Sequence, residues 1–248
     1  MSASDQKFSH VANFTGYMEV VARYFVGLPG GLRVLDMPAG NGKLADALRE
    51  LGHQVVCADI NRERPDYVYV DMSEPLPFTD AEFDAVVCLE GVEHLVDPAA
   101  LIANLVQITK PGGTIVVSTP NIMNFYSRLQ FLMTGAPFQF NPAAVHDVAP
   151  GEQRDRGHIS PLSYYQLRYL FGCCGARVEA VLGDRYKKKA LLPLYLLLLP
   201  FAWLCTRFAL LGAADPGHAA RNRELFAHTF SAPLMFSRSL VLVLKRER

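Results

Sequence analysis

Residues 32–42 read LRVLDMPAGNG, and this stretch decides the fold. An apolar run ends in Asp36, a turn of small residues and glycines follows, and residues 42–51 then carry leucine and alanine at helical spacing. Glycines let backbone N–H groups approach a ligand closely, and a helix that opens at Gly42 adds the positive end of its dipole. A strand, a glycine turn and a helix in this order predict the nucleotide-binding unit of an α/β protein.

Short apolar runs alternate with helical stretches along the rest of the chain. We expect strands over 32–36, 54–59, 67–70, 83–89, 113–118, 176–183 and 239–246. We expect helices over 8–26, 42–51, 98–108, 122–133 and 161–172, and a loop over 134–160. Strands separated by helices form parallel sheets with right-handed crossovers. The pattern predicts a doubly wound, mostly parallel, seven-stranded α/β sheet in a single domain over 1–248.

Acidic residues end the second and third expected strands. A carboxylate at Asp59 can accept hydrogen bonds from both ribose hydroxyls of a nucleotide. A carboxylate at Asp71 can accept one from the exocyclic amine of adenine. Each acid alone is more often a solvated strand end, so the order strand, glycine turn, helix, strand, acid is the stronger signal.

Four segments resemble the class I S-adenosylmethionine-dependent methyltransferases, in the small-molecule type 11/23-like group. They are VLDMPAGNGKLADAL (34–48), VVCADI (55–60), DMSEPLPFTDAEFDAVVCLEGVEHLVDP (71–98) and LVQITKPGGTIVVSTPN (105–121). The resemblance covers about residues 32–121 and implies a Rossmann-like methyltransferase fold, a methyltransferase activity and S-adenosyl-L-methionine as cofactor. The family's first glycine is Pro38 here, which removes one N–H and stiffens the turn. A dinucleotide-dependent dehydrogenase is the weaker alternative, because the chain lacks room for a separate substrate domain.

The resemblance also assigns roles to single residues. The turn after the first strand would contact the methionine part of the cofactor, Asp59 the ribose, Asp71 and Met72 the adenine, and Leu89 and Glu90 would close the pocket. The expected cofactor-binding residues are Asp36, Pro38, Ala39, Gly40, Asn41, Gly42, Asp59, Ile60, Asp71, Met72, Leu89 and Glu90.

A histidine is the candidate catalytic residue. Methyl transfer from a sulfonium depends mainly on alignment, and a hydroxyl acceptor also benefits from a general base. His94, His146 and His158 are the candidates, and in the family the histidine at His94 mainly shapes the loop after the fourth strand. His158 lies in GHISPLSYYQL, which resembles a segment over the acceptor site of relatives, so we predict it as the base; the simpler interpretation is a helix-entry residue bonded to backbone. No metal site is expected, because no cysteine or histidine spacing resembles one.

Residues 190–206 (ALLPLYLLLLPFAWLCT) carry no charge, and basic residues flank them. The run is short for a full span, which takes about 20 residues, and it contains two prolines. The family's last two strands form an antiparallel hairpin, so the strands on either side of the run must lie on one side of any membrane. We therefore expect an apolar and basic helical insertion over 185–237, before the last strand, that docks shallowly or as a re-entrant element. A buried helix, a dimer interface or a lid over the acceptor are the alternatives.

The charge distribution also separates the insertion from the rest of the chain. The totals are equal, 24 Lys+Arg and 24 Asp+Glu, but residues 1–184 hold 13 basic and 21 acidic side chains, whereas residues 185–248 hold 11 and 3. A nucleic-acid-binding protein more often carries its basic face through the folded domain, so no nucleic acid is expected. Five cysteines without a CxxC motif indicate a reducing, cytoplasmic compartment.

These observations predict a cytoplasmic methyltransferase that is peripheral or re-entrant at the inner face of the membrane. Its expected acceptor is lipid-linked or amphipathic, such as a glycan intermediate or an isoprenoid. The rival hypotheses are a soluble small-molecule methyltransferase, and a cofactor-binding membrane subunit without catalysis. The sequence leaves the oligomeric state and the acceptor's attacking atom open.

Overall fold

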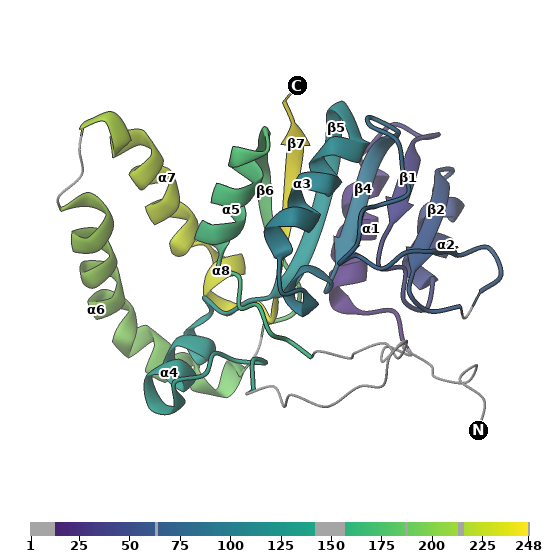
Figure 1. Cartoon of the computed structure of the whole chain (residues 1–248). Coiled ribbons are helices and arrows are strands. Elements are labelled where there is room, and N and C mark those ends of the chain that lie inside the picture. The colour runs from purple at the N-terminus through teal and green to yellow at the C-terminus, as the bar shows by residue number, and fades with distance from the viewer. Residues whose placement is uncertain (1–12, 63, 142–156, 187, 213–215, 248) are drawn as a thin grey trace.

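The computed structural model describes residues 13–62, 64–141, 157–186, 188–212 and 216–247. These residues form a seven-stranded sheet in the order β3-β2-β1-β4-β5-β7-β6 (Figure 1). The strands are β1 (Arg33–Asp36), β2 (Gln54–Asp59), β3 (Val68–Tyr69), β4 (Phe83–Leu89), β5 (Thr109–Pro120), β6 (Ala176–Gly183) and β7 (Ser239–Arg246). β7 lies between β5 and β6 and runs antiparallel to both, while the other neighbours are parallel.

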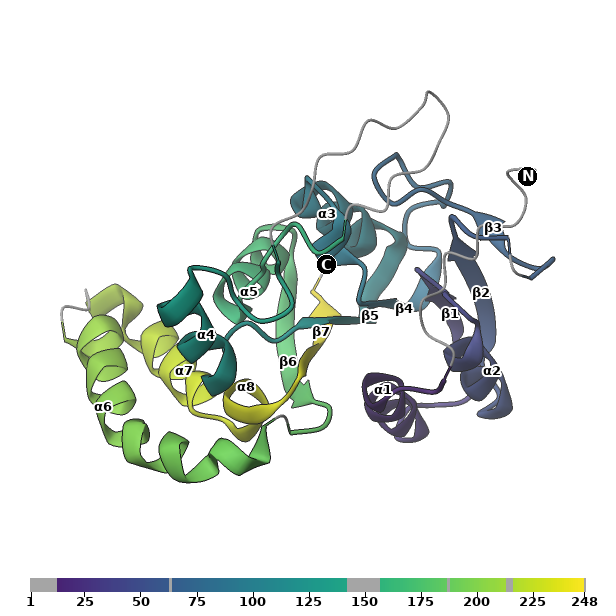
Figure 2. The ribbon, with the colours of Figure 1, turned by 90° about the horizontal axis from the view of Figure 1, so that it is seen from below.

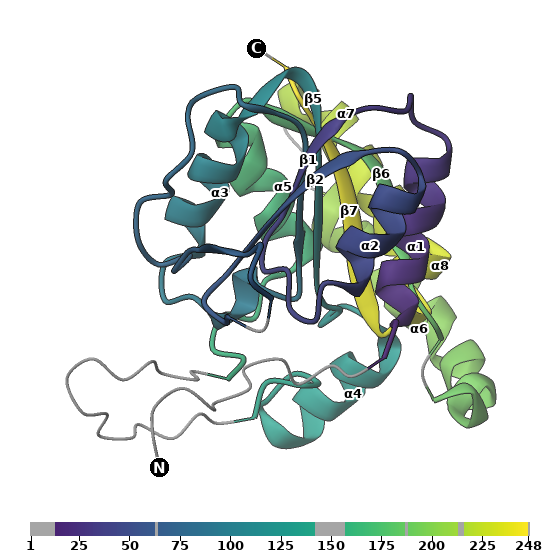
Figure 3. The same cartoon turned by 90° about the vertical axis from the view of Figure 1, so that its right-hand side faces the viewer.

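Helices cover both faces of the sheet. Figure 3 shows α1 (Gly16–Val26) and α2 (Lys43–Glu50) on one side and α3 (Pro98–Ile108) and α5 (Tyr164–Cys173) on the other. Side chains alternate along each strand, so Val34 and Val87 pack under α1 and α2, whereas Leu35 and Val86 pack under α3 and α5. This two-sided burial explains why the central strands are apolar at nearly every position.

Capping residues determine where several helices begin. Asp97 accepts hydrogen bonds from the N–H groups of Ala99 and Ala100 at the start of α3, which has a proline in its first turn. Ser163 and Gln166 form a reciprocal capping box at the start of α5. Because α5 begins there, the segment just before it, which contains His158, is held at the carboxyl edge of the sheet.

The predicted fold class is confirmed, and most element bounds agree within a few residues. β3 is shorter than predicted, and β5 starts earlier, because Thr109 already pairs with Phe83 ahead of a register shift. Before β7 the chain forms the helices α7 (Ala219–Thr229) and α8 (Ala232–Phe236), which the polar sequence did not indicate. His146 lies outside the described residues.

The insertion forms an arm beyond the β6 edge. The apolar run becomes α6 (Leu192–Leu211), preceded by a short 3-10 turn (Lys189–Leu191), and α6 passes around the outside of α7 (Figure 2). Trp203 of α6 packs edge-on against Phe226 of α7, and the Asn222 side-chain amide donates to the carbonyl of Leu210. Of the α6 side chains, Tyr195 alone is buried. The alternative of a buried core helix is therefore not supported.

The start of the arm is anchored beside the carboxyl edge of the sheet. α4 (Phe125–Thr134) follows β5 at that edge and lies next to the first turns of α6 (Figure 1). The Phe125 ring stacks on the Tyr195 ring, with centroids 5.2 Å apart. The Asn121 side-chain amide donates to the carbonyls of Pro233, Leu234 and Ser237, which fixes α8 to the end of β5.

Candidate active site

The turn between β1 and α2 has a conformation that requires glycine. Gly40 and Gly42 both adopt positive φ, +53° and +73°. A Cβ on Gly42 would lie 2.5 Å from the Arg64 guanidinium carbon and 2.6 Å from the Tyr67 hydroxyl, whereas a Cβ on Gly40 would meet no atom within 4 Å. The backbone at Gly40 therefore borders open space, as a turn that approaches a ligand requires.

Asp59 at the end of β2 is bonded to this turn. One carboxylate oxygen accepts from the Gly40 N–H at 2.7 Å and the other from the Asn61 N–H at 2.9 Å, and the side chain is buried. The Asn61 side-chain amide donates to the Gly40 carbonyl at 3.1 Å. Each carboxylate oxygen has a second lone pair. Asp59 thus holds the turn in place from the end of β2.

Asp36 at the end of β1 is a buried acid with an oxygen that lacks a protein partner. Among the described residues, its Oδ2 atom makes no hydrogen bond. Burial, and secondarily the charge of Asp59, raises the pKa of Asp36 to about 7. A cationic group beside it would stabilise the carboxylate. The ammonium of an amino acid fits this need, so the residues present suit the methionine part of S-adenosylmethionine.

Pro38 packs against the turn that follows β4. The Met37–Pro38 peptide is cis, and a Cβ on Gly91 would lie 2.8 Å from the Pro38 ring and 3.2 Å from the end of Met72. Because residue 91 has no side chain, the turn after β4 can pack against both Pro38 and Met72. The departure from the family's glycine at position 38 is thus accommodated by close packing in this chain.

The remaining predicted cofactor residues surround the same edge. Ala39 donates its N–H to the Ala58 carbonyl, which ties the turn to β2. Asp71 accepts hydrogen bonds from the Ser73 N–H and hydroxyl at 2.9 and 2.6 Å. Leu89 is buried, and Glu90 has a positive φ of +49°. The partly buried members of the set are Pro38, Asn41, Ile60, Asp71, Met72 and Glu90. The structure places all of these residues at the carboxyl ends of β1 to β4, and their cofactor roles stay predictions.

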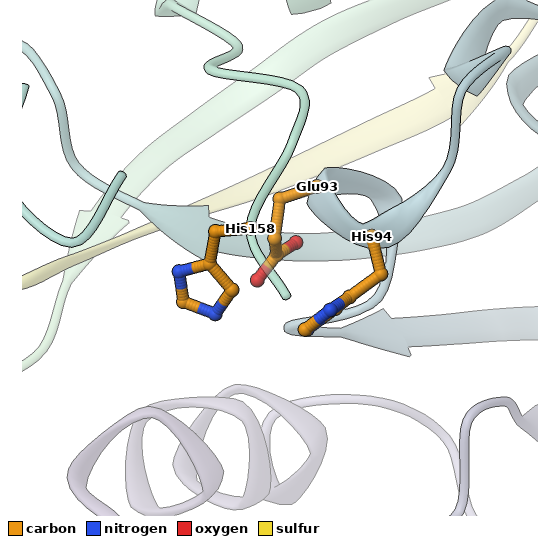
Figure 4. A group of neighbouring side chains, drawn as sticks. All are labelled: Glu93, His94 and His158. Carbon is orange, nitrogen blue, oxygen red and sulfur yellow. The ribbon is translucent and has the colours of Figure 1, made fainter. Parts of the chain in front are cut away.

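His158 lies beside the 3-10 turn η2 (Val92–His94) that follows β4. The N–H groups of Ile159 and Ser160 both donate to the Glu93 carbonyl at 3.0 Å, so the two segments are joined by backbone hydrogen bonds. The His158 ring packs edge-on against the His94 ring, with centroids 4.8 Å apart. Figure 4 shows the Glu93 carboxylate between the two rings.

One metal-ligating atom from each of Glu93, His94 and His158 lies within 4.8 Å of the others. Glu93 is not among the site residues predicted from the sequence, and the expectation of no metal site stays a prediction. The approach of His158 depends on tertiary structure.

Two carboxyl groups of this region are close enough to influence each other. Burial, and secondarily the charge of Glu90, raises the pKa of Glu93 well above its usual value. Burial also raises the pKa of Glu90 to about 7, although the Ser118 hydroxyl donates to its carboxylate at 2.9 Å. The positive charge of Arg238 lowers the pKa values of Glu90 and Glu93 and so offsets part of the rise that burial causes. The same charge also lowers the pKa of Tyr17 of α1. Burial therefore favours the protonated form of both carboxyl groups more than water does.

Comparisons with known proteins agree with the fold. A family model described as "Methyltransferase domain" matches residues 10–179. A ubiquinone biosynthesis O-methyltransferase of Xanthomonas campestris pv. campestris (strain B100) is 36% identical over 130 residues, which are 47% of this chain and 53% of that protein. One of Xylella fastidiosa (strain 9a5c) is 35% identical over 171 residues, 63% of this chain and 65% of that protein. The chain spans about half the length of the first of these relatives.

A solved structure supports the fold. A SAM-dependent methyltransferase from Archaeoglobus fulgidus superposes with a TM-score of 0.56 at 20% identity, covering 92% of this chain and 94% of that one. A glycine turn after β1 and acids at the ends of β1 and β2 are the arrangement found in α/β nucleotide-binding folds. The chain belongs to the methyltransferase-domain family.

Proposed function

We propose that this protein is an S-adenosylmethionine-dependent methyltransferase that methylates a hydroxyl group on an amphipathic, isoprenoid-like acceptor at a membrane surface. The observation that carries the proposal is the position of the exposed apolar arm, which begins beside the carboxyl edge where the glycine turn and His158 lie. An acceptor held at the lipid surface would reach that edge without passing through water. The relatives named as ubiquinone biosynthesis O-methyltransferases support oxygen as the attacking atom and a lipid-like acceptor.

The cofactor end of the site follows from the buried acids. S-adenosylmethionine supplies an electrophilic methyl group on a sulfonium. Asp36 would pair with the ammonium of the methionine part, and Asp59 would accept from the ribose hydroxyls while it holds Gly40 in place. Asp71 and Met72 would frame the adenine, because the Gly91 contact brings this segment beside the turn.

His158 is the proposed group next to the acceptor. Its Nδ1 atom lies 3.0 Å from the Gln139 carbonyl oxygen. A carbonyl oxygen can only accept, so Nδ1 carries the proton and Nε2 is the basic nitrogen of the ring. A base with a hydrogen-bonded second nitrogen keeps its orientation while it takes a proton from a hydroxyl. The backbone hydrogen bonds to Glu93 hold the segment against η2.

The arm supports membrane docking. Within the described part of the chain, Lys189–Leu211 is long and apolar enough to cross a membrane by length and composition, and little of it is buried. Its exposed side chains include Leu196, Leu197, Phe201 and Phe208, and α4 adds Phe131, Leu132 and Met133. Lys188 and Lys189 lie at its start and Arg207 near its end. β6 and β7 pair along their length, so both flanks stay on one side, and we propose peripheral or re-entrant docking at the cytoplasmic face.

Lipid analysis tests the acceptor. Extracts from cells with and without the gene should differ by a species that is one CH2 heavier, and purified enzyme with labelled cofactor should transfer label to a hydroxylated isoprenoid aromatic in vesicles. Label on water-soluble hydroxyl compounds alone would instead favour the soluble methyltransferase with the arm as a lid or dimer interface. Light scattering on a variant that replaces 190–212 with a polar linker tests the dimer.

A further inference from the structure

The segment between β2 and β3 holds the glycine turn through the carbonyl groups of the turn. The Asn61 side-chain amide and the Tyr67 hydroxyl both donate to the Gly40 carbonyl, each at 3.1 Å. Arg64 donates to the next carbonyl, that of Asn41, at 2.9 Å. Two successive carbonyls of the turn are thus hydrogen-bonded by side chains that lie 21 to 27 residues away in the sequence.

Arg64 links the turn to α2 at the same time. Its Nη1 and Nη2 atoms donate to the two carboxylate oxygens of Asp46, each at 2.7 Å, and Nη2 also makes the bond to the Asn41 carbonyl. Arginine can form such a bidentate pair because its planar guanidinium presents donors in a fixed fork. Because Asp46 lies in the first turn of α2, one side chain connects the glycine turn to the helix that follows it.

Gly42 leaves the space that these side chains occupy. It is among the residues predicted to contact the cofactor, but the atoms nearest to its Cβ position belong to the Arg64 guanidinium, at 2.5 Å, and to the Tyr67 hydroxyl, at 2.6 Å. A Cβ on Gly40 meets nothing within 4 Å. The two glycines therefore differ, because Gly40 borders open space and Gly42 accommodates the side chains that hold the turn.

The bonds to the carbonyls also determine how the turn presents its N–H groups. The C=O and N–H groups of a trans peptide point in opposite directions. The bond from Tyr67 to the Gly40 carbonyl therefore directs the Asn41 N–H away from Tyr67. A glycine turn without such bonds samples further conformations, and its apparent affinity for a ligand falls with the fraction of protein in the binding conformation.

We propose that Arg64 and Tyr67 are positioning residues that set the affinity for S-adenosylmethionine by holding the glycine turn in its binding conformation before the cofactor arrives. Neither side chain needs to touch the cofactor. The identity of the cofactor rests on the proposed function, whereas the bonds that hold the turn do not depend on it. The side chains of Arg64 and Asp46 are 30% and 45% exposed, so high salt should weaken the effect.

Calorimetric titration of the cofactor-free full chain with S-adenosylmethionine tests the proposal. Arg64→Gln should weaken binding roughly 5- to 20-fold, as expected for a charged hydrogen bond that is partly exposed. Tyr67→Phe keeps the ring and removes only the hydroxyl, and it should weaken binding roughly 2- to 10-fold. Arg33→Gln is the matched control, because Arg33 also pairs with an acid, Glu82, but lies at the start of β1 and not at its end. This control should bind the cofactor as the unmodified chain does.

Asp46 gives a second test, because it acts on the turn through Arg64. Asp46→Ala should weaken binding by itself but should add little to Arg64→Gln. Each single variant should raise the KM for the cofactor while kcat at saturating cofactor stays near that of the unmodified chain, a split that loss of folded protein does not produce. Amide hydrogen exchange over residues 39–42 of the cofactor-free protein should be faster in Tyr67→Phe.

Unchanged affinity in folded Arg64→Gln and Tyr67→Phe, or an equal loss in Arg33→Gln, would overturn the proposal. Fully additive losses would overturn it as well, because Asp46 would then act without Arg64. If the unmodified chain binds no S-adenosylmethionine, the proposed function fails instead. Faster exchange of the turn in cofactor-free Tyr67→Phe would then still support the hold of this side chain on the turn.

Discussion

Two exposed side chains of α6 give a quantitative test of membrane docking. Leu197 is 75% exposed and Phe201 is 69% exposed. Full burial of such side chains contributes about 1.5–3 kcal/mol each, so their exposed parts together contribute roughly 2–4 kcal/mol on transfer to a bilayer. Replacing both with serine should therefore lower partition into vesicles roughly 30- to 1,000-fold.

The assay is co-sedimentation of the full chain with vesicles over a range of lipid concentrations, with and without anionic lipid. Val26→Ser combined with Val96→Ser is the matched control, because these side chains are 66% and 75% exposed but lie away from the arm. The control should partition as the unmodified protein does. Equal losses in the two double variants, or no loss in the α6 variant, would refute docking through α6. A fall in molecular mass by light scattering on the α6 variant would point to a dimer interface.

Four further changes test the cofactor and acceptor ends of the site. Asp59→Ala should weaken S-adenosylmethionine binding by about 1.5–3 kcal/mol, measured by calorimetry, and unchanged affinity in a folded variant would remove the ribose assignment. Gly42→Ala should lower the free energy of unfolding by about 1–3 kcal/mol in urea, because φ is +73° and the new Cβ meets Arg64. His158→Gln should reduce turnover roughly 10²- to 10⁴-fold, and a matching loss of cofactor affinity would contradict its place at the acceptor. The pKa of Asp36 is raised from 3.8 to about 7, so between those pH values the folded state holds a proton that the unfolded state has lost. Asp36 should therefore remove up to about 4 kcal/mol of stability from the cofactor-free protein as pH rises from 4 to 7. Asp36→Asn should make the pH dependence of unfolding in urea shallower by that amount, while the part due to Glu90 and Glu93 remains.

The fold was predictable because its information is local in the chain. Strands 54–59, 83–89, 176–183 and 239–246 have the predicted bounds, since each is an apolar run ended by a turn or a polar residue. The predicted cofactor-binding residues at the carboxyl edge of the sheet could be placed together from the order of strands in the chain. Once the strands are parallel, residues at their carboxyl ends must meet, so Asp36 and Asp59 converge whatever their separation in sequence.

The helical insertion shows where local information ends. Apolar segments in a protein core, in an interface and against lipid can have the same composition. Composition alone therefore does not predict what surrounds such a segment. α6 lies outside α7 with Tyr195 as its buried anchor, and this arrangement depends on α7 and α8, which the sequence pattern did not reveal. Helices α7 and α8 lie on the inner side of α6 (Figure 2), and their mainly polar sequence carries no apolar stripe that would have predicted this position.

The sequence by itself determined the parallel sheet, the glycine turn, the acids at the strand ends and the presence of an exceptionally apolar segment, because periodicity and chain order encode them. Tertiary structure decided which side chains meet across segments. The contact of Pro38 with Gly91 and the approach of His158 to Glu93 and His94 depend on how loops pack at the carboxyl edge. Loop packing is set by contacts between residues distant in the chain, and a single sequence carries no periodic signal for such contacts.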